Sequence, residues 1–222
     1  MITDNTYYVD ELYLPHAVPD ASDAFLDVKS TVGRFIDKYE KDCLLKSLGR
    51  DLSREFYSNI DPSESSKIKA GADAKWDELM NGVQYTDANG NVKDWRGIRF
   101  ELVEGEGYDR SLLANYIYFF YEKNEDTTRT NVGNVQESAT NAARISKRPK
   151  VSSAWNEFVG MTQGECVTPN IMYNNGLIGI DYYQGGFETS LYEFINDKNT
   201  IDDATYEGFN PKSWGEISPI GL

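Results

Sequence analysis

Hydrophobic side chains recur every three or four positions along residues 25–56, which is the spacing of an amphipathic helix. Gly49 lies inside this run and is a candidate break or close-packing point. The pattern therefore predicts two helices, at about 23–40 and 42–59, with one apolar face each.

A third helix and a hairpin are predicted next. The helix starts at Ser65 or Ser66 and ends at Asn81-Gly82, a helix stop signal. Two short segments then lie on either side of Asn89-Gly90, the dipeptide that type I′ turns prefer. We therefore expect a β-hairpin at about 83–96.

The most apolar stretch, residues 112–121, has hydrophobic side chains around most of a helix circumference. We expect a central, buried helix that Asp109 caps and that ends at Tyr121. The other elements expected in this region are a polar loop at 122–134, a helix at about 135–146, and a helix that starts at Ser152 or Ser153.

Both ends of the chain lack a regular period. Residues 1–21 contain aromatic side chains and two prolines, and the segment from Tyr206 onward is similar. One short helix is expected before that segment, between Gly186 and Asp197, with Phe187, Leu191, Phe194 and Ile195 as its hydrophobic residues. The predicted fold is mainly α: a helical bundle with an inserted β-hairpin and extended N- and C-terminal arms. The expected parts are an N-terminal arm at 1–21, a helical core at 22–163, and an irregular C-terminal extension with one short helix at 164–222.

The composition is acidic and rich in tyrosine. The 222 residues include 36 Asp and Glu and 22 Lys and Arg, which gives a formal charge of −14. Such a surface repels nucleic-acid phosphate, so sequence-specific DNA binding is not expected. No secretory signal is visible, and the most apolar run is too short to span a membrane, so a protein made in a cytoplasm is expected.

Groups for catalysis or metal binding are sparse. The single histidine, His16, lies in the N-terminal arm, and the two cysteines, Cys43 and Cys166, lack metal-site spacing. Carboxylate pairs such as Glu101 with Glu104, or Asp202 with Asp203, have the character of solvated surface groups. We therefore expect no enzyme activity, no cofactor and no metal.

Seven short motifs carry a resemblance to a known family, over about residues 22–160. In chain order they are FIDKYE at 35–40, LGRDL at 48–52, LMNGVQY at 79–85, WRGI at 95–98, ANYIYFF at 114–120, TNVGNV at 130–135 and AWNEF at 154–158. Together they resemble the head–tail connector (adaptor, or ring) proteins of tailed bacteriophages. Among these, the chain looks most like the variant of Bacteroides phages, including the crAss-like group.

The resemblance implies a structural virion protein without catalytic residues. Its expected place is the neck of the virion, as a ring, usually of twelve copies, beneath the portal, assembled in the cytoplasm of the bacterial host. The implied partners are further copies of the chain, the portal protein and the next neck or tail protein, while genomic DNA passes the lumen without specific binding and no membrane is involved.

The residues expected at subunit contacts are exposed aromatic or turn residues in the arms and the hairpin. They are Tyr7, Tyr8, Leu12 and Tyr13 in the N-terminal arm, Asn89 and Gly90 at the hairpin tip, and Phe209 and Trp214 in the C-terminal arm. Two other classes stay open from the sequence: a monomeric protein- or glycan-binding accessory module, and a hydrolase that uses a carboxylate pair.

Overall fold

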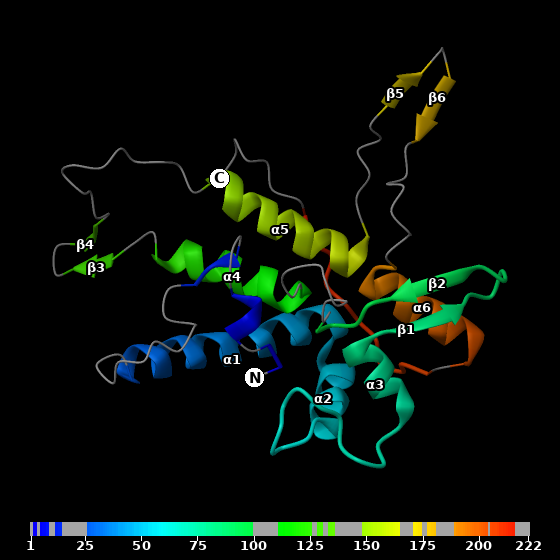
Figure 1. Ribbon diagram of the computed structural model, residues 1–222, viewed down its shortest axis with the longest axis horizontal. Helices are drawn as coiled ribbons and strands as arrows, with labels where there is room; N and C mark the ends of the chain where they lie inside the picture. Colours follow the sequence, from blue (N-terminus) through cyan, green and yellow to red (C-terminus); the bar gives the residue numbers. More distant parts are fainter. Residues whose placement is uncertain are drawn as a thin grey trace.

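The computed structural model describes residues 2–3, 5–8, 12–14, 26–99, 111–125, 128–130, 133–135, 148–164, 171–174, 177–180, 189–203 and 205–215. Over these residues the protein is mainly helical, as the sequence predicts (Figure 1). The helices are η1 (Asn5–Tyr7), α1 (Leu26–Leu48), α2 (Arg50–Asn59), α3 (Ala74–Asn81), α4 (Leu112–Glu125), α5 (Arg148–Gln163) and α6 (Leu191–Ile201). The strands are β1 (Val83–Thr86), β2 (Val92–Trp95), β3 (Thr128–Thr130), β4 (Gly133–Val135), β5 (Ile171–Asn174) and β6 (Leu177–Ile180), which form three separate antiparallel pairs.

Helix α4 is the centre of the helical layer, as its apolar sequence predicts. It packs against α5 on one side and α1 on the other (Figure 1). Every residue from Ser111 to Phe119 is buried. The predicted cap, Asp109, lies outside the described residues, but the Ser111 hydroxyl accepts the N–H of Leu113 at 3.1 Å.

The first predicted helix boundary is wrong. Helix α1 runs without interruption to Leu48, because its apolar face continues through Cys43 and Leu44, which are fully buried. The break comes at Gly49, whose φ of +88° favours glycine. A Cβ at this position would lie 2.8 Å from the backbone oxygen of Asn210, so the chain also approaches itself too closely for a side chain.

The predicted start of the third helix is also wrong. Helix α3 begins at Ala74, where the Asp73 carboxylate accepts the N–H of Lys75 at 3.1 Å and caps the helix. The residues before it form turns held by a single β-bridge between Ile60 and Ile68. The spacing of apolar residues in this segment therefore reflects burial in an irregular loop.

The predicted hairpin is confirmed, with β1 and β2 paired from Val83 opposite Trp95 to Thr86 opposite Val92. Its turn is not type I′, however. Gly90 N–H donates to the Asp87 carbonyl at 3.0 Å, and Gly90 has a φ of +86°. This is a three-residue turn that ends in a left-handed glycine. The wider turn forms because the Asp87 carboxylate accepts the N–H groups of Asn89 and Asn91.

The middle of the chain differs from the predicted pattern at the end of α4 and at the start of α5. Helix α4 continues to Glu125, and the hairpin β3–β4 occupies part of the predicted polar loop. Of the helix expected at 135–146, Val135 belongs to β4 and the remainder lies outside the described residues. Helix α5 starts at Arg148, since Pro149 is compatible with the first turn of a helix.

The described residues 189–203 and 205–215 pack onto the helical layer. The Tyr206 hydroxyl donates to the Lys75 carbonyl at 2.7 Å, and the Asn210 N–H donates to the Leu48 carbonyl at 3.1 Å. The short helix predicted between Gly186 and Asp197 is confirmed where the structure describes it: α6 begins at Leu191 and extends to Ile201, while Phe187 lies outside the described residues. No helix in the part of the chain that the structure describes is long and apolar enough to cross a membrane.

Candidate functional site: a hairpin fixed to helix α6

The hairpin β1–β2 has one buried face and one exposed face, as the alternation of its side chains requires. On the buried face, Tyr85 and Trp95 contact Phe194 of α6, with ring centroids 5.5 Å and 5.3 Å apart. The exposed face carries the side chains of Gln84, Thr86, Val92 and Asp94. One face of the hairpin therefore belongs to the core, and the other is open to solvent.

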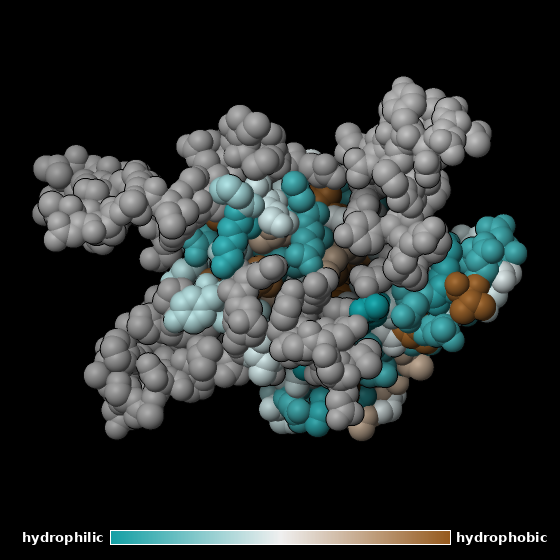
Figure 2. All heavy atoms as spheres, turned by 45° about the horizontal axis from the view of Figure 1, so that its top comes forward, coloured by the Kyte–Doolittle hydropathy of each residue, from teal (hydrophilic) through white to brown (hydrophobic). Residues whose placement is uncertain are grey.

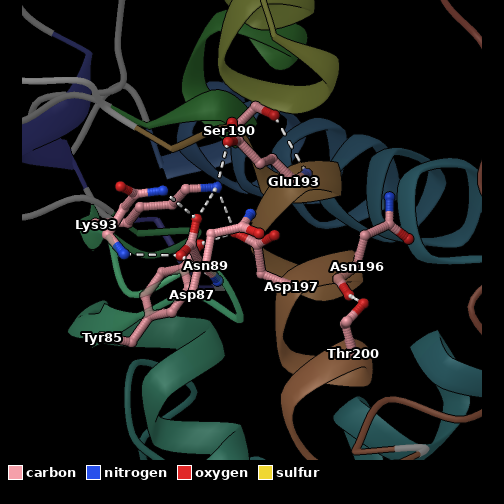
Figure 3. Close-up of polar contacts among 10 residues, drawn as sticks. Tyr85, Asp87, Asn89, Lys93, Ser190, Glu193, Asn196, Asp197 and Thr200 are labelled. Atoms are coloured by element: carbon pink, nitrogen blue, oxygen red, sulfur yellow. Dashed lines mark hydrogen bonds and ion pairs between the residues drawn. The ribbon is translucent and has the colours of Figure 1, made fainter.

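A polar cluster, here named the Lys93 network, joins the hairpin to α6 (Figure 3). The Lys93 ammonium lies 2.7 Å from carboxylate oxygens of Glu193 and Asp197 and 3.6 Å from Asp87. The Tyr85 hydroxyl donates to the same Asp197 oxygen at 2.7 Å. One lysine thus connects the turn, both strands and the helix.

The local sequence of α6 places two of these carboxylates. The Ser190 hydroxyl accepts the N–H of Glu193 at 3.3 Å and so fixes the first turn of the helix. Glu193 and Asp197 are four residues apart and therefore lie on the same face of α6. That face is turned toward Lys93 (Figure 3).

The protonation states of the network suit a structural role. Burial lowers the pKa of Lys93. Hydrogen bonds and attraction from Asp197 and Glu193 raise it by more than burial lowers it, so the net pKa is above the ordinary value. Burial and the hydrogen bond to Asp197 raise the pKa of Tyr85. Hydrogen bonds from Asn91 and Asn89 lower the pKa of Asp87 to about 2. The raised pKa values keep Lys93 charged and Tyr85 neutral near neutral pH, which suits the ion pairs and the hydrogen bond that they form.

The base of the hairpin is fixed as well. The Trp95 indole N–H donates to the Leu79 carbonyl at 3.3 Å, and Thr189 N–H donates to the Asp94 carbonyl at 3.1 Å. Gly82 and Gly97 bring the chain before and after the hairpin into contact: a Cβ on Gly97 would lie 2.5 Å from the Met80 oxygen. The hairpin therefore extends from a rigid attachment to α3 and α6.

The far end of the hairpin is exposed. Val92 is 67% exposed, the largest exposure among the large hydrophobic residues of the described chain. Figure 2 shows a hydrophobic patch surrounded by hydrophilic residues at this end of the molecule. Because Asp87 and Asn91 form a hydrogen-bonded pair, the backbone groups of Gln84 and Thr86 point to the outer edge of β1.

The structure separates the residues predicted for subunit contacts into two groups. Asn89 and Gly90 are exposed at the hairpin tip, and Tyr13 is 53% exposed. Tyr7, Tyr8 and Leu12 instead lie in the protein's own core. Their apolar side chains are buried against the chain that bears them, and their part in a subunit contact stays a prediction.

The two C-terminal aromatic residues also pack within the chain. Phe209 contacts Tyr192, with ring centroids 5.5 Å apart. Trp214 contacts Tyr116, Trp155 and Phe158, with centroids 5.2 to 5.9 Å apart. Its indole N–H donates to the Tyr192 hydroxyl at 3.0 Å. These residues close the aromatic cluster over α4 and α5.

Sequence reasoning missed the Lys93 network and the role of Glu40. Lys93 and Asp197 are 104 residues apart, and no local pattern marks either one. Glu40 lies among the apolar residues of α1 and is 2% exposed. Its position on the buried face of an amphipathic helix was the one available signal, since a buried carboxylate requires hydrogen-bond donors.

The chemical groups considered from the sequence do not form a reactive site where the structure describes them. Within the described ranges, no group of His, Cys, Asp or Glu side chains can hold a metal ion. Asp202 and Asp203 are exposed, and burial raises the pKa of the Cys43 thiol. His16, Cys166, Glu101 and Glu104 lie outside the described residues. A shallow depression of about 330 Å³ on α2 is lined by Asp51, Arg54, Glu55 and Ser58.

Comparisons of the chain with protein-family models, with curated proteins and with solved structures find no match.

Proposed function

We propose that the chain is a structural virion protein, a subunit of a head–tail connector ring that links the capsid to the tail beneath the portal. The hairpin β1–β2 is the observation that carries this proposal. It is held at its base by α3 and α6, and its end exposes Val92, Asn89 and Gly90. A rigid element with an exposed apolar tip is suited to contact a neighbouring molecule, because it loses little conformational freedom on binding.

The resemblance to connector proteins supplies the identity of the assembly. In such a ring each subunit presents two different surfaces, one to each neighbour. The hairpin tip supplies one of them in this proposal. The acidic composition suits a channel for DNA, since like charge prevents phosphate from adhering to the wall. The proposed partners are other copies, the portal protein and the next neck or tail protein.

The test is the oligomeric state of the purified protein, measured by mass photometry alone and with particles that lack it. We expect rings, or density below the portal of the completed particles. A protein that stays monomeric and does not bind the particles would overturn the proposal and favour the accessory binding module.

The hairpin tip has a matched test. Val92→Asp places a charge at the exposed apolar position and is expected to reduce ring formation at least tenfold without changing thermal stability. Ala70→Asp adds the same charge at an exposed loop position away from the hairpin and is the control. Equal assembly by the two variants would remove the hairpin from the interface.

A further inference from the structure

We propose that the N-terminal segment, residues 2–14, is exchanged between neighbouring copies, so that Glu40 of one subunit binds Ile2 and Thr3 of the next. This inference rests on the proposed ring and adds a second contact between neighbours to the one that the hairpin tip makes. The receptor for the segment is defined here as Glu40 of α1 with the core surface around it.

The contact of Glu40 with the segment is specific. One carboxylate oxygen accepts the Ile2 N–H at 3.0 Å, and the other accepts the Thr3 N–H at 2.7 Å and the Thr3 hydroxyl at 2.6 Å. The Thr3 hydroxyl also lies 3.0 Å from that of Tyr8. Among the described residues, no lysine or arginine forms an ion pair with Glu40. The segment therefore supplies the donors that this buried carboxylate requires.

Apolar burial adds to this recognition. Ile2, Tyr7, Tyr8 and Leu14 are each 2% exposed or less, and Leu12 is 8% exposed. The described residues of the segment include one short 3-10 helix, η1, and the buried side chains of the segment contact the rest of the core. The segment therefore resembles a bound peptide that is also covalently joined to the protein that binds it.

Few large hydrophobic side chains are exposed where the structure describes burial. Among those residues, and outside the segment, the exposed ones are Leu45, Val92 and Ile201. Stable ring contacts need a well-packed apolar centre. If neighbours exchange the segment, the contacts of Ile2, Tyr7, Tyr8, Leu12 and Leu14 become intersubunit contacts, which supplies that centre.

The covalent connection permits the exchange. Eleven residues, 15–25, join the segment to α1 and include Pro15 and Pro19. A chain of this length spans up to about 36–40 Å when extended. Exchange keeps every contact of the segment and changes only which copy supplies it, so it is a low-cost route to association. The segment and its receptor are different surfaces, as a closed ring requires.

Complementation between two full-length variants tests the exchange. Thr3→Pro removes the Thr3 N–H and hydroxyl but leaves the receptor intact, whereas Glu40→Ala removes the acceptor but leaves the segment intact. Each variant alone lacks a good pair in any arrangement. In an equal mixture, the intact segment of the Glu40→Ala copy can bind the intact receptor of the Thr3→Pro copy. We expect the mixture to form at least fivefold more oligomer than either variant alone at the same total concentration.

Wild-type protein provides a second measurement that needs no variant. Copies labelled with ¹⁵N and unlabelled copies are unfolded, mixed and reassembled, and a carbodiimide then joins the carboxylate of Asp4, which follows Thr3 in the sequence, to Lys38 or Lys41, which neighbour Glu40. Cross-linked peptides that combine heavy and light halves are expected, because exchange joins different copies.

The outcomes are distinguishable. Rings whose cross-links are all within one copy, or a mixture of variants with no gain in oligomer, would overturn the exchange and leave the connector proposal intact. Wild-type protein that forms no oligomer and only intramolecular cross-links would overturn both. Small oligomers with heavy–light cross-links but no rings would support the exchange and count against the connector.

Discussion

Trp214 distinguishes a residue that stabilises the subunit from one that joins subunits. Sequence reasoning placed it at a subunit contact, but the structure places it within the chain, where its ring contacts Tyr116, Trp155 and Phe158. Gln163 fixes its backbone, with a side-chain N–H donated to the Trp214 carbonyl at 2.6 Å and a side-chain oxygen accepting the Trp214 N–H at 3.0 Å. We therefore predict that Trp214→Ala lowers the stability of the monomer.

The magnitude follows from the contacts that the substitution removes. Three edge-to-face aromatic contacts contribute about 0.5 to 1 kcal/mol each. The hydrogen bond from the indole N–H to the Tyr192 hydroxyl contributes about 1 kcal/mol. Loss of all four interactions should lower the free energy of unfolding by about 3 kcal/mol, which is at the lower end of the range for tryptophan truncation in a core.

The assay is urea unfolding followed by far-UV circular dichroism, because six helices supply the signal. With an m-value of about 2 kcal/mol/M, the predicted change moves the transition midpoint by about 1.5 M. The exposed Tyr13 is the matched control, since Tyr13→Ala removes an aromatic side chain without core contacts and should shift the midpoint by less than about 0.3 M.

A Trp214→Ala protein with an unchanged midpoint would refute this reasoning. If such a protein also failed to assemble, Trp214 would belong to a subunit interface after all, and the packing of residues 205–215 onto α4 and α5 would need another explanation.

Three further predictions concern the hairpin. Gly97→Ala should lower the free energy of unfolding by at least about 2 kcal/mol, measured by urea unfolding, because residue 97 has a φ of +89° and a Cβ would lie 2.5 Å from the Met80 oxygen; an unchanged midpoint would contradict the close approach. Lys93→Met leaves the carboxylates of Glu193 and Asp197 without their cation. It should lower the free energy of unfolding by about 1–2 kcal/mol in 50 mM salt and by less in 1 M salt. A loss of stability that is independent of salt would contradict an electrostatic role. The folded-state pKa of Asp87, about 2, lies below its usual value of 3.8, so its ionised form stabilises the fold above about pH 4, and this contribution is lost as the pH falls toward 2. The stability difference between the wild type and Asp87→Asn should therefore be constant above pH 4 and decrease below it, and a difference that stays constant down to pH 2 would refute the assignment.

The sequence predicted those parts of the fold that depend on local pattern. The helical class, the central buried helix and the hairpin at 83–96 follow from periodicity and from the turn signal at Asn89-Gly90. The exact turn type did not follow, because the side chain of Asp87 selects a wider turn. The predicted helix boundary near residue 41 was wrong because the buried face of α1 continues past it. The predicted helix start at Ser65 was wrong because an irregular loop can also contain apolar residues.

The candidate site was less predictable because its residues meet only after folding. Asn89 and Gly90 were found as turn residues, whereas Lys93, Glu193 and Asp197 carry no local signal of their partnership. The sequence predicted arms for the aromatic residues at both chain ends, because hydrophobic residues have no regular spacing in these segments. Tyr8 and Trp214 show that an irregular segment can still be part of a core when its side chains are large and hydrogen-bonded.

The contact between Gly82 and Gly97 also has a consequence for the search for relatives. The two positions are 15 residues apart along the chain but lie against each other in space, where neither backbone leaves room for a side chain. A protein that shares this hairpin must therefore keep both glycines even after the rest of its sequence has changed. Two glycines at this spacing, with an apolar helix end before the first and a tryptophan two positions before the second, form a short signature that could identify distant relatives when overall sequence similarity no longer does.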